Sequence, residues 1–274
     1  MEIRFALEHE FKEIVKCANK FFNKDDGYFE TLVPILYKNG INTYKNHIIA
    51  LKKNMIVGIL AYKEIIQNDS KYIAIGTVCV DANFRGQGIM NQLFNFLFDN
   101  VSNNDGYVLI GNYDLYKRFG FEKSNDSLLH YFEKVNNNFT FKKINYDSDL
   151  TKSKKLYESI DYKVNRDNLI LNIMMWCNEP YKIYKDDNEI GYLIYNARKN
   201  VIDEIVLEDY SIIVNLLESF SYFKDNVVSL RTPIVENQLT KFLKEQRKGI
   251  SKDKLLIKSN KNIKGIYIRS SDLI

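Results

Sequence analysis

Residues 78–90, which read Val-Cys-Val-Asp-Ala-Asn-Phe-Arg-Gly-Gln-Gly-Ile-Met, decide the fold of this chain. An apolar strand leads into a turn at 85–88, and apolar residues at helical spacing follow to about residue 100. The two glycines of the turn have no side chains that would hold a ligand away from the main chain. Strand, turn and helix N-terminus therefore predict a pocket of backbone N–H groups suited to a pyrophosphate, with Arg85 adding a positive charge.

Two better-known phosphate motifs do not match this stretch. The dinucleotide fingerprint G-x-G-x-x-G needs a third glycine where this chain has Asn91. The P-loop needs Gly-Lys followed by Ser or Thr, a sequence that the turn lacks.

What remains, a V-x-V strand followed by R-x-x-G, resembles motif A of the GNAT acetyltransferases, whose pattern is Q/R-x-x-G-x-G/A. Arg85, Gly88 and Met90 fall on its three defined positions. Met90 departs from the small residue usual at the third position. A bulky residue there also occurs in GNAT proteins of the enhanced intracellular survival type, so we interpret Met90 as a subfamily feature.

A second segment supports this resemblance. A short apolar strand over residues 107–110 precedes residues 111–121, which end in Tyr-x-x-Phe-Gly-Phe and resemble GNAT motif B. Gly120 suits the left-handed conformation that often follows a helix. The two motifs together, at this spacing, predict a GNAT fold.

The first half reads as βααβββαβαββ, the element order of a GNAT domain. Its predicted strands cover 2–7, 47–52, 56–66, 71–80, 107–110, the region of Phe121 and 128–132, and its predicted helices cover 9–22, 29–37 with a break near Pro34, 90–100 and a short motif B helix.

The second half repeats the plan. Its predicted strands cover 139–144, 181–184, 190–195, 201–207, 227–231, 255–257 and 263–268, and its predicted helices cover 150–160, 164–177, 211–220 and 235–245. The strands at 181–184 and 190–195 are predicted to form a hairpin around residues 186–189. Residues 206–211, where motif A would lie, contain no glycine and no suitably spaced Arg or Gln.

We therefore predict an α/β (α+β) protein of two tandem GNAT-like domains, each a mixed, mostly antiparallel sheet flanked by helices. Residues 1–136 would be the catalytic domain and residues 137–274 a degenerate domain without the cofactor motif. This arrangement resembles the enhanced intracellular survival acetyltransferases. Those proteins carry a third, sterol-carrier-like domain whose C-terminal carboxylate is the catalytic base, and 274 residues leave no room for it, so that role is not carried over.

Composition limits the functional classes. A hydrophobic content of 45% and a charged content of 27% indicate a soluble globular protein without a membrane span, and no signal peptide is recognisable, so we expect a cytoplasmic protein. A net charge of +4 gives little support for nucleic-acid binding. Three widely spaced cysteines suggest neither a disulfide framework nor a metal site.

The resemblance implies acetyl-CoA as co-substrate and direct transfer of its acetyl group to a primary amine in a ternary complex. It implies that the 78–80 strand holds the pantetheine arm, that the 86–91 amides take the pyrophosphate, and that Tyr116 is the general acid. The cofactor-binding residues implied are Val78, Cys79, Val80, Arg85, Gly86, Gln87, Gly88, Ile89, Met90, Asn91, Gly111 and Asn112.

The sequence leaves several alternatives open. The base is not identified: Glu30, Asp26 and Asp114 are considered, whereas His47 and His130 fit core or surface positions better. The acceptor, expected between the two domains, is a small amine, an aminoglycoside-like cation, or a peptide lysine or N-terminus. A non-catalytic acyl-CoA sensor and a different acyl donor are the competing functions. The sequence does not decide whether the protein forms a homo-oligomer.

Overall fold

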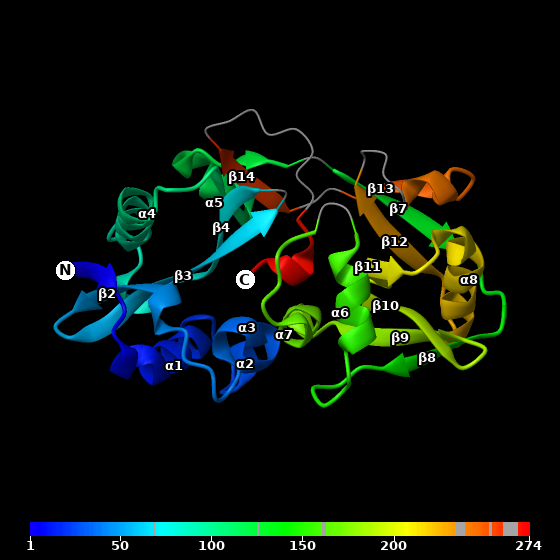
Figure 1. The fold of residues 1–274 in the computed structure, drawn as a ribbon. Coiled ribbons are helices and arrows are strands. Elements are labelled where there is room, and N and C mark those ends of the chain that lie inside the picture. The colour runs from blue at the N-terminus through cyan, green and yellow to red at the C-terminus, as the bar shows by residue number, and fades with distance from the viewer. Residues whose placement is uncertain (68, 125, 161–162, 234–238, 252–253, 260–267) are drawn as a thin grey trace.

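The computed structural model describes residues 1–67, 69–124, 126–160, 163–233, 239–251, 254–259 and 268–274. Two seven-stranded sheets lie side by side and carry helices on their faces (Figure 1). In each sheet one neighbouring pair is parallel, β4 with β5 and β11 with β12, and the other pairs are antiparallel. The predicted fold class is confirmed.

The first sheet has the spatial order β1 (Glu2–Phe5), β2 (His47–Lys52), β3 (Met55–Gln67), β4 (Ser70–Val80), β5 (Gly106–Ile110), β14 (Leu255–Ser259) and β6 (Glu122–Lys123). The second has the order β13 (Lys248–Ser251), β7 (Ser127–Phe132), β12 (Val228–Pro233), β11 (Val201–Leu207), β10 (Asn188–Asn196), β9 (Glu179–Lys185) and β8 (Phe139–Lys143).

Helices cover both faces of the first sheet and build two separate cores. Helix α1 (Phe11–Phe21) buries an apolar stripe at three- to four-residue spacing against one face, together with the short helices α2 (Tyr28–Leu32) and α3 (Pro34–Tyr37). Helix α4 (Ile89–Asn100) packs on the opposite face. Pro34 is the first residue of α3, so the predicted break in this region is confirmed.

The second sheet is covered in the same way by α6 (Thr151–Glu158) and α7 (Leu169–Ile173) on one side and by α8 (Ile213–Phe223) on the other. The predicted hairpin of β9 and β10 forms around Asp186 and Asp187, which both have positive φ angles of 48° and 60°.

Two strands lie in the sheet opposite to the one predicted. The strand predicted at 128–132 to complete the first half is β7, and it pairs in the second sheet between β12 and β13. The strand predicted at 255–257 to close the second half is β14, and it pairs in the first sheet between β5 and β6. The halves therefore exchange a strand, because the buried side chains of β14 fit the cores of the first sheet.

Other differences are local. The helix predicted over 164–177 is shorter, since α7 covers Leu169–Ile173 and Trp176 has a φ of 61°, outside the helical region. Residues 240–243 form a 3₁₀ turn, and the first part of the helix predicted at 235–245 lies outside the described residues. Most of the strand predicted at 263–268 also lies outside them. Among the described helices, none combines the length and apolar character needed to cross a membrane.

Candidate active site

The turn at 85–88 leaves the end of β4 and opens directly into α4. Gly86 and Gly88 have φ angles of 77° and 72°, in the region that side chains disfavour, and a Cβ on either would meet no atom within 4 Å. Gly88 precedes α4 and has no side chain with which to cap the first amides of the helix, from Ile89 to Asn91. This geometry suits an anion at the helix N-terminus.

Three cationic side chains lie at this turn, and no sequence pattern predicts that two of them, Lys52 and Arg118, come to it. Lys52 donates from Nζ to Oε1 of Gln87 at 3.2 Å, and Arg118 lies 3.5 Å from the sulfur of Met90. Both come from distant segments that only the fold brings to the turn. Arg85, predicted to add charge at the site, donates from Nε to the carbonyl of Val80 at 3.1 Å and from Nη2 to that of Phe21 at 3.4 Å.

The strand before the turn separates from its parallel neighbour. The paired register of β4 with β5 runs from Tyr72 opposite Gly106 to Ile75 opposite Leu109, whereas β4 continues to Val80. A bulge at Thr77, with a φ of 46°, shifts the register of β4 against β3 at the same level. The stretch 76–80, which includes Val78 and Cys79, thus extends past β5 and forms one side of a V-shaped opening.

A tyrosine closes the other side of this opening. Asn112, which follows β5, caps α5 (Tyr113–Tyr116) by accepting a hydrogen bond from the amide of Asp114 at 3.0 Å. The ring of Tyr116 covers Gly111 so closely that a Cβ there would lie 2.4 Å from Cε2 of the ring. Gly120, with a φ of 83°, ends the motif B turn in the predicted left-handed conformation.

Burial raises the pKa of the Tyr116 phenol above its ordinary value. The group therefore stays protonated at neutral pH and can donate a proton. Cys79 is buried in the core, and burial raises the pKa of its thiol far above the ordinary range, so this side chain packs as a neutral group.

The surroundings of the candidate bases make several of them unsuitable, and none is identified as the catalytic base. His47 is buried between the Thr43 carbonyl and the Tyr37 hydroxyl, and burial lowers its pKa to about 4. His130 lies in the second sheet, where it contacts Thr232. Of the carboxylates considered, Asp114 is exposed and paired with Lys117 at 2.8 Å, and Glu30 accepts a hydrogen bond from Asn19 of α1 at 3.2 Å.

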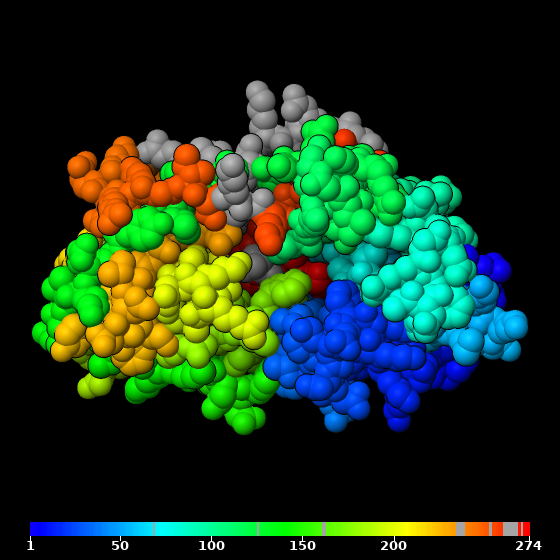
Figure 2. Space-filling view, turned by 180° about the vertical axis from the view of Figure 1, so that it is seen from behind, coloured from blue at the N-terminus to red at the C-terminus, as the bar shows by residue number. Residues whose placement is uncertain are grey.

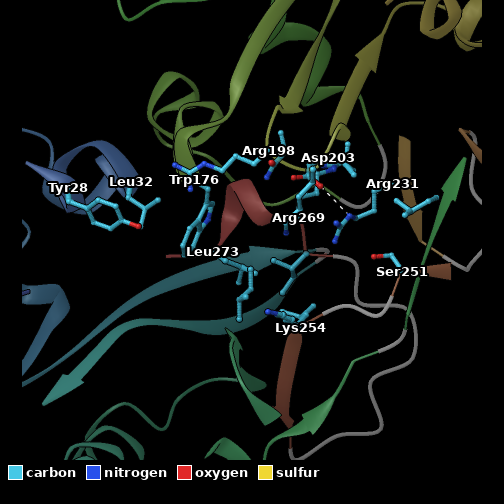
Figure 3. A pocket seen from close by; sticks show the side chains of 17 residues that line it. Tyr28, Leu32, Trp176, Arg198, Asp203, Arg231, Ser251, Lys254, Arg269 and Leu273 are labelled. Carbon is cyan, nitrogen blue, oxygen red and sulfur yellow. Dashed lines mark ion pairs between the residues drawn. The ribbon is translucent and has the colours of Figure 1, made fainter. Parts of the chain in front are cut away.

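A cleft of about 630 Å³ lies between the two sheets (Figures 2 and 3). Its first-sheet side includes Tyr28 and Leu32 of α2 and Ile110, the last residue of β5. Leu273 lines it as well, and the main chain of the next residue, Ile274, presses on Gly76 of β4, where a Cβ would lie 2.0 Å from its oxygen. One end of the cleft therefore adjoins the opening between β4 and β5.

A buried ion network fixes the segment that carries Leu273. Arg166 donates from Nε to Asp272 at 2.7 Å and from both terminal nitrogens to Glu204 at 2.9 and 2.7 Å. The side chains of all three residues are at most 1% exposed. The hydroxyl of Tyr192 donates to Glu204 at 2.6 Å. The network ties residues 268–274, red in Figure 1, to the second sheet, while the side chains of Ile268, Leu273 and Ile274 enter the core of the first.

Residues 208–212, between β11 and α8, contain no glycine turn. After β11, the carboxylate of Asp209 accepts hydrogen bonds from the amide and the hydroxyl of Ser211 at 2.8 and 2.6 Å, much as Asp81 after β4 accepts from the amide of Asn83 at 2.9 Å. In the first half the turn at 85–88 then precedes α4, whereas in the second half the 3₁₀ turn Tyr210–Ile212 leads directly into α8.

Comparisons with known proteins agree with this geometry. Residues 43–123 match the family described as acetyltransferase (GNAT) domain. No curated protein matches the chain. Among solved structures, a GCN5-related N-acetyltransferase from Anabaena variabilis ATCC 29413 shares 15% identity with a TM-score of 0.62, over 93% of this chain and 72% of that one.

Eis1 from Mycobacterium abscessus shares 12% identity with a TM-score of 0.63, over 94% of this chain and 74% of that one. A conserved protein from Enterococcus faecalis V583, described as a probable N-acyltransferase, shares 14% identity with a TM-score of 0.64, over 93% and 72%. At these identities the likeness shows a common fold that extends over both halves of the chain.

Proposed function

Residues 43–123 form a GNAT acetyltransferase domain, and from this premise we propose that the chain is an acetyl-CoA-dependent N-acetyltransferase acting on a primary amine. The observation that carries the proposal is the glycine turn at 85–88, whose open helix amides lie beside the separated edge of β4. Only the first half carries this site in our proposal, because in the second half the 3₁₀ turn Tyr210–Ile212 leads directly into α8 without a glycine turn that could bind a phosphate.

The amides from Gly86 to Asn91 bind the diphosphate of the co-substrate, and Lys52 and Arg118 add positive charge beside it. The free edge of β4 at Val78, Cys79 and Val80 pairs with the pantetheine arm, and a backbone N–H near Val80 donates to the thioester oxygen as negative charge develops on it. Gly111 and Asn112 line the far side of the arm.

The acceptor amine attacks the carbonyl carbon directly, a C–N bond forms, the C–S bond breaks, and the nitrogen releases one proton to solvent, from which the Tyr116 phenolate is later reprotonated. Tyr116 gives its phenolic proton to the departing thiolate, whose pKa as a free thiol is about 8.5. The amine enters from the central cleft, because that cleft adjoins the opening between β4 and β5.

Incubation of the protein with acetyl-CoA and a panel of primary amines, while free thiol is followed, tests the proposal. We expect amine-dependent thiol release well above hydrolysis. Tight acetyl-CoA binding without release would contradict catalysis and favour the sensor. If calorimetry detects no binding of coenzyme A, the assignment of the glycine turn is wrong.

A further inference from the structure

The central cleft is lined by more basic than acidic side chains. Among the described residues that line it, five are cationic and one is acidic: Arg198, Lys199, Arg231, Lys254 and Arg269, against Asp203. They come from the β10–β11 turn, from β11 and β12, from the residue before β14 and from the C-terminal segment, and Figure 3 shows most of them facing the same space. A cation-rich wall built from so many segments creates a positive potential inside the cleft.

Acidic partners offset only part of this charge. Asp203 pairs with Arg231 at 3.2 Å, drawn as a dashed line in Figure 3, and Glu204 lies 3.5 Å from Arg269. Within the described part of the chain, Arg198, Lys199 and Lys254 form no ion pair. The side chains of these three residues can therefore bind an anionic ligand.

The coenzyme's own phosphates do not explain this charge. They bind at the N-terminus of α4, on one face of the first sheet, whereas Leu255, Ile268 and Leu273 of the cleft belong to the core on the opposite face. In the proposed binding mode, the acyl end of the co-substrate is the part that points toward the cleft, through the opening beside Ile110. The basic wall therefore faces the acceptor.

From this arrangement we infer that the acceptor is an amine that also carries an anionic group, a carboxylate or a phosphate. The inference rests on the proposed function and adds a substrate class to it. The apolar wall of Tyr28, Leu32 and Trp176 packs on the body of the molecule, and the basic wall binds its anion. A positive field also favours the neutral form of the amine, which is the nucleophile, and disfavours polycations such as aminoglycosides.

Trp176 makes binding measurable without turnover, because it lines the cleft and is the only tryptophan of the chain. The probes are matched pairs, 4-aminobutyrate against butylamine for a carboxylate and phosphoethanolamine against ethanolamine for a phosphate, with spermidine as a polycation. Each is titrated against the full chain with coenzyme A present while tryptophan fluorescence is recorded, and each is then assayed for thiol release with acetyl-CoA.

We expect at least one anionic probe to bind about tenfold or more tightly than its neutral-tailed partner, the factor that roughly 1.4 kcal/mol produces. The pair that shows the preference distinguishes carboxylate from phosphate. The double variant Arg198→Gln, Lys199→Gln should abolish the preference. Its control, Lys12→Gln with Lys16→Gln on exposed positions of α1, removes the same charge outside the cleft and should preserve it.

Equal or tighter binding of butylamine, ethanolamine or spermidine would overturn the inference, as would an anion preference that survives in the cleft variant. Thiol release confined to cationic or neutral amines would also overturn it while supporting the proposed function. Anion-selective binding without thiol release would support the inference about the cleft and contradict catalysis.

Discussion

Tyr116 and Gly111 form the most constrained residue pair of the site. The ring of Tyr116 can lie over the end of β5 only because Gly111 has no side chain. Phe94 and Phe121 hold the ring from other sides, with centroids at 5.9 and 6.2 Å. The phenol is thus fixed by packing, which favours a role as a positioned acid.

Replacing Tyr116 by Phe tests this role. The substitution keeps the packing and removes the proton, so we expect kcat to fall by about tenfold or more while acetyl-CoA affinity stays nearly constant. Steady-state kinetics and calorimetry measure the two quantities. Unchanged kcat would remove Tyr116 from the mechanism.

A substitution of Gly88 by Ala tests the phosphate cradle. The left-handed conformation costs alanine roughly 1–2 kcal/mol, and the new methyl group enters the space in front of the helix amides, so coenzyme A binding should weaken. Gly40→Ala is the matched control, because Gly40 has a φ of 88° and equally open surroundings away from the turn. If both variants bind coenzyme A equally well, the turn is not the diphosphate site.

His47 gives the fold a pH dependence. Burial lowers its folded-state pKa to about 4, below the unfolded value of 6.5, so the unfolded chain binds the extra proton first. His47 therefore does not reduce the free energy of unfolding above pH 6.5. As pH falls toward 4, its protonation in the unfolded chain lowers the free energy of unfolding by an amount on the order of 3 kcal/mol. Urea unfolding at pH 7 and 4.5 should show this loss, and His47→Gln should reduce it. An equal loss in the variant would assign it to other groups.

At the scale of elements, the exchange of β7 and β14 joins the two halves. The first sheet includes β14 from the second half of the sequence, and the second sheet includes β7 from the first half. Neither sequence half, 1–136 or 137–274, therefore holds all the strands of one sheet. The proposed difference between the halves concerns which of them carries the co-substrate site, since neither half has a complete sheet of its own.

We expect the fragments 1–136 and 137–274 to be unfolded when expressed separately and to recover structure when mixed. Far-UV circular dichroism measures this for the separate and combined fragments. In the intact chain, Trp176 fluorescence and circular dichroism should report a single unfolding transition. A fragment that folds alone, or two separate transitions, would show that the exchange does not couple the halves.

Across the whole molecule, the Arg166 network positions the segment that lines the cleft. Arg166→Met would leave Glu204 and Asp272 buried with less compensation, at a cost of roughly 3–5 kcal/mol in the free energy of unfolding. Leu273 would lose its fixed position, so thiol release should fall as well. Chemical denaturation and the thiol assay measure both effects.

Arg4→Met is the control, because Arg4 makes a similar two-bond contact with Glu10 at the edge of the first sheet but is 26% exposed. We expect it to cost about 1 kcal/mol or less. Similar losses for both variants would mean that burial of the Arg166 network contributes little.

The glycine turn, the helix after it and the motif B tyrosine could be predicted from the sequence, because these features depend on local conformation. Positive φ angles select glycine, and helical spacing places apolar residues on one face. The same local rules identified the hairpin of β9 and β10 and the break at Pro34.

Other features depend on long-range packing: which sheet each strand joins, how Lys52 and Arg118 reach the turn, and how five cationic side chains come to line one cleft. The sequence of a short apolar strand such as β14 does not specify which strands it pairs with, because many neighbours can bury the same side chains. Charges far apart in sequence become one electrostatic site only after folding fixes the distances between them.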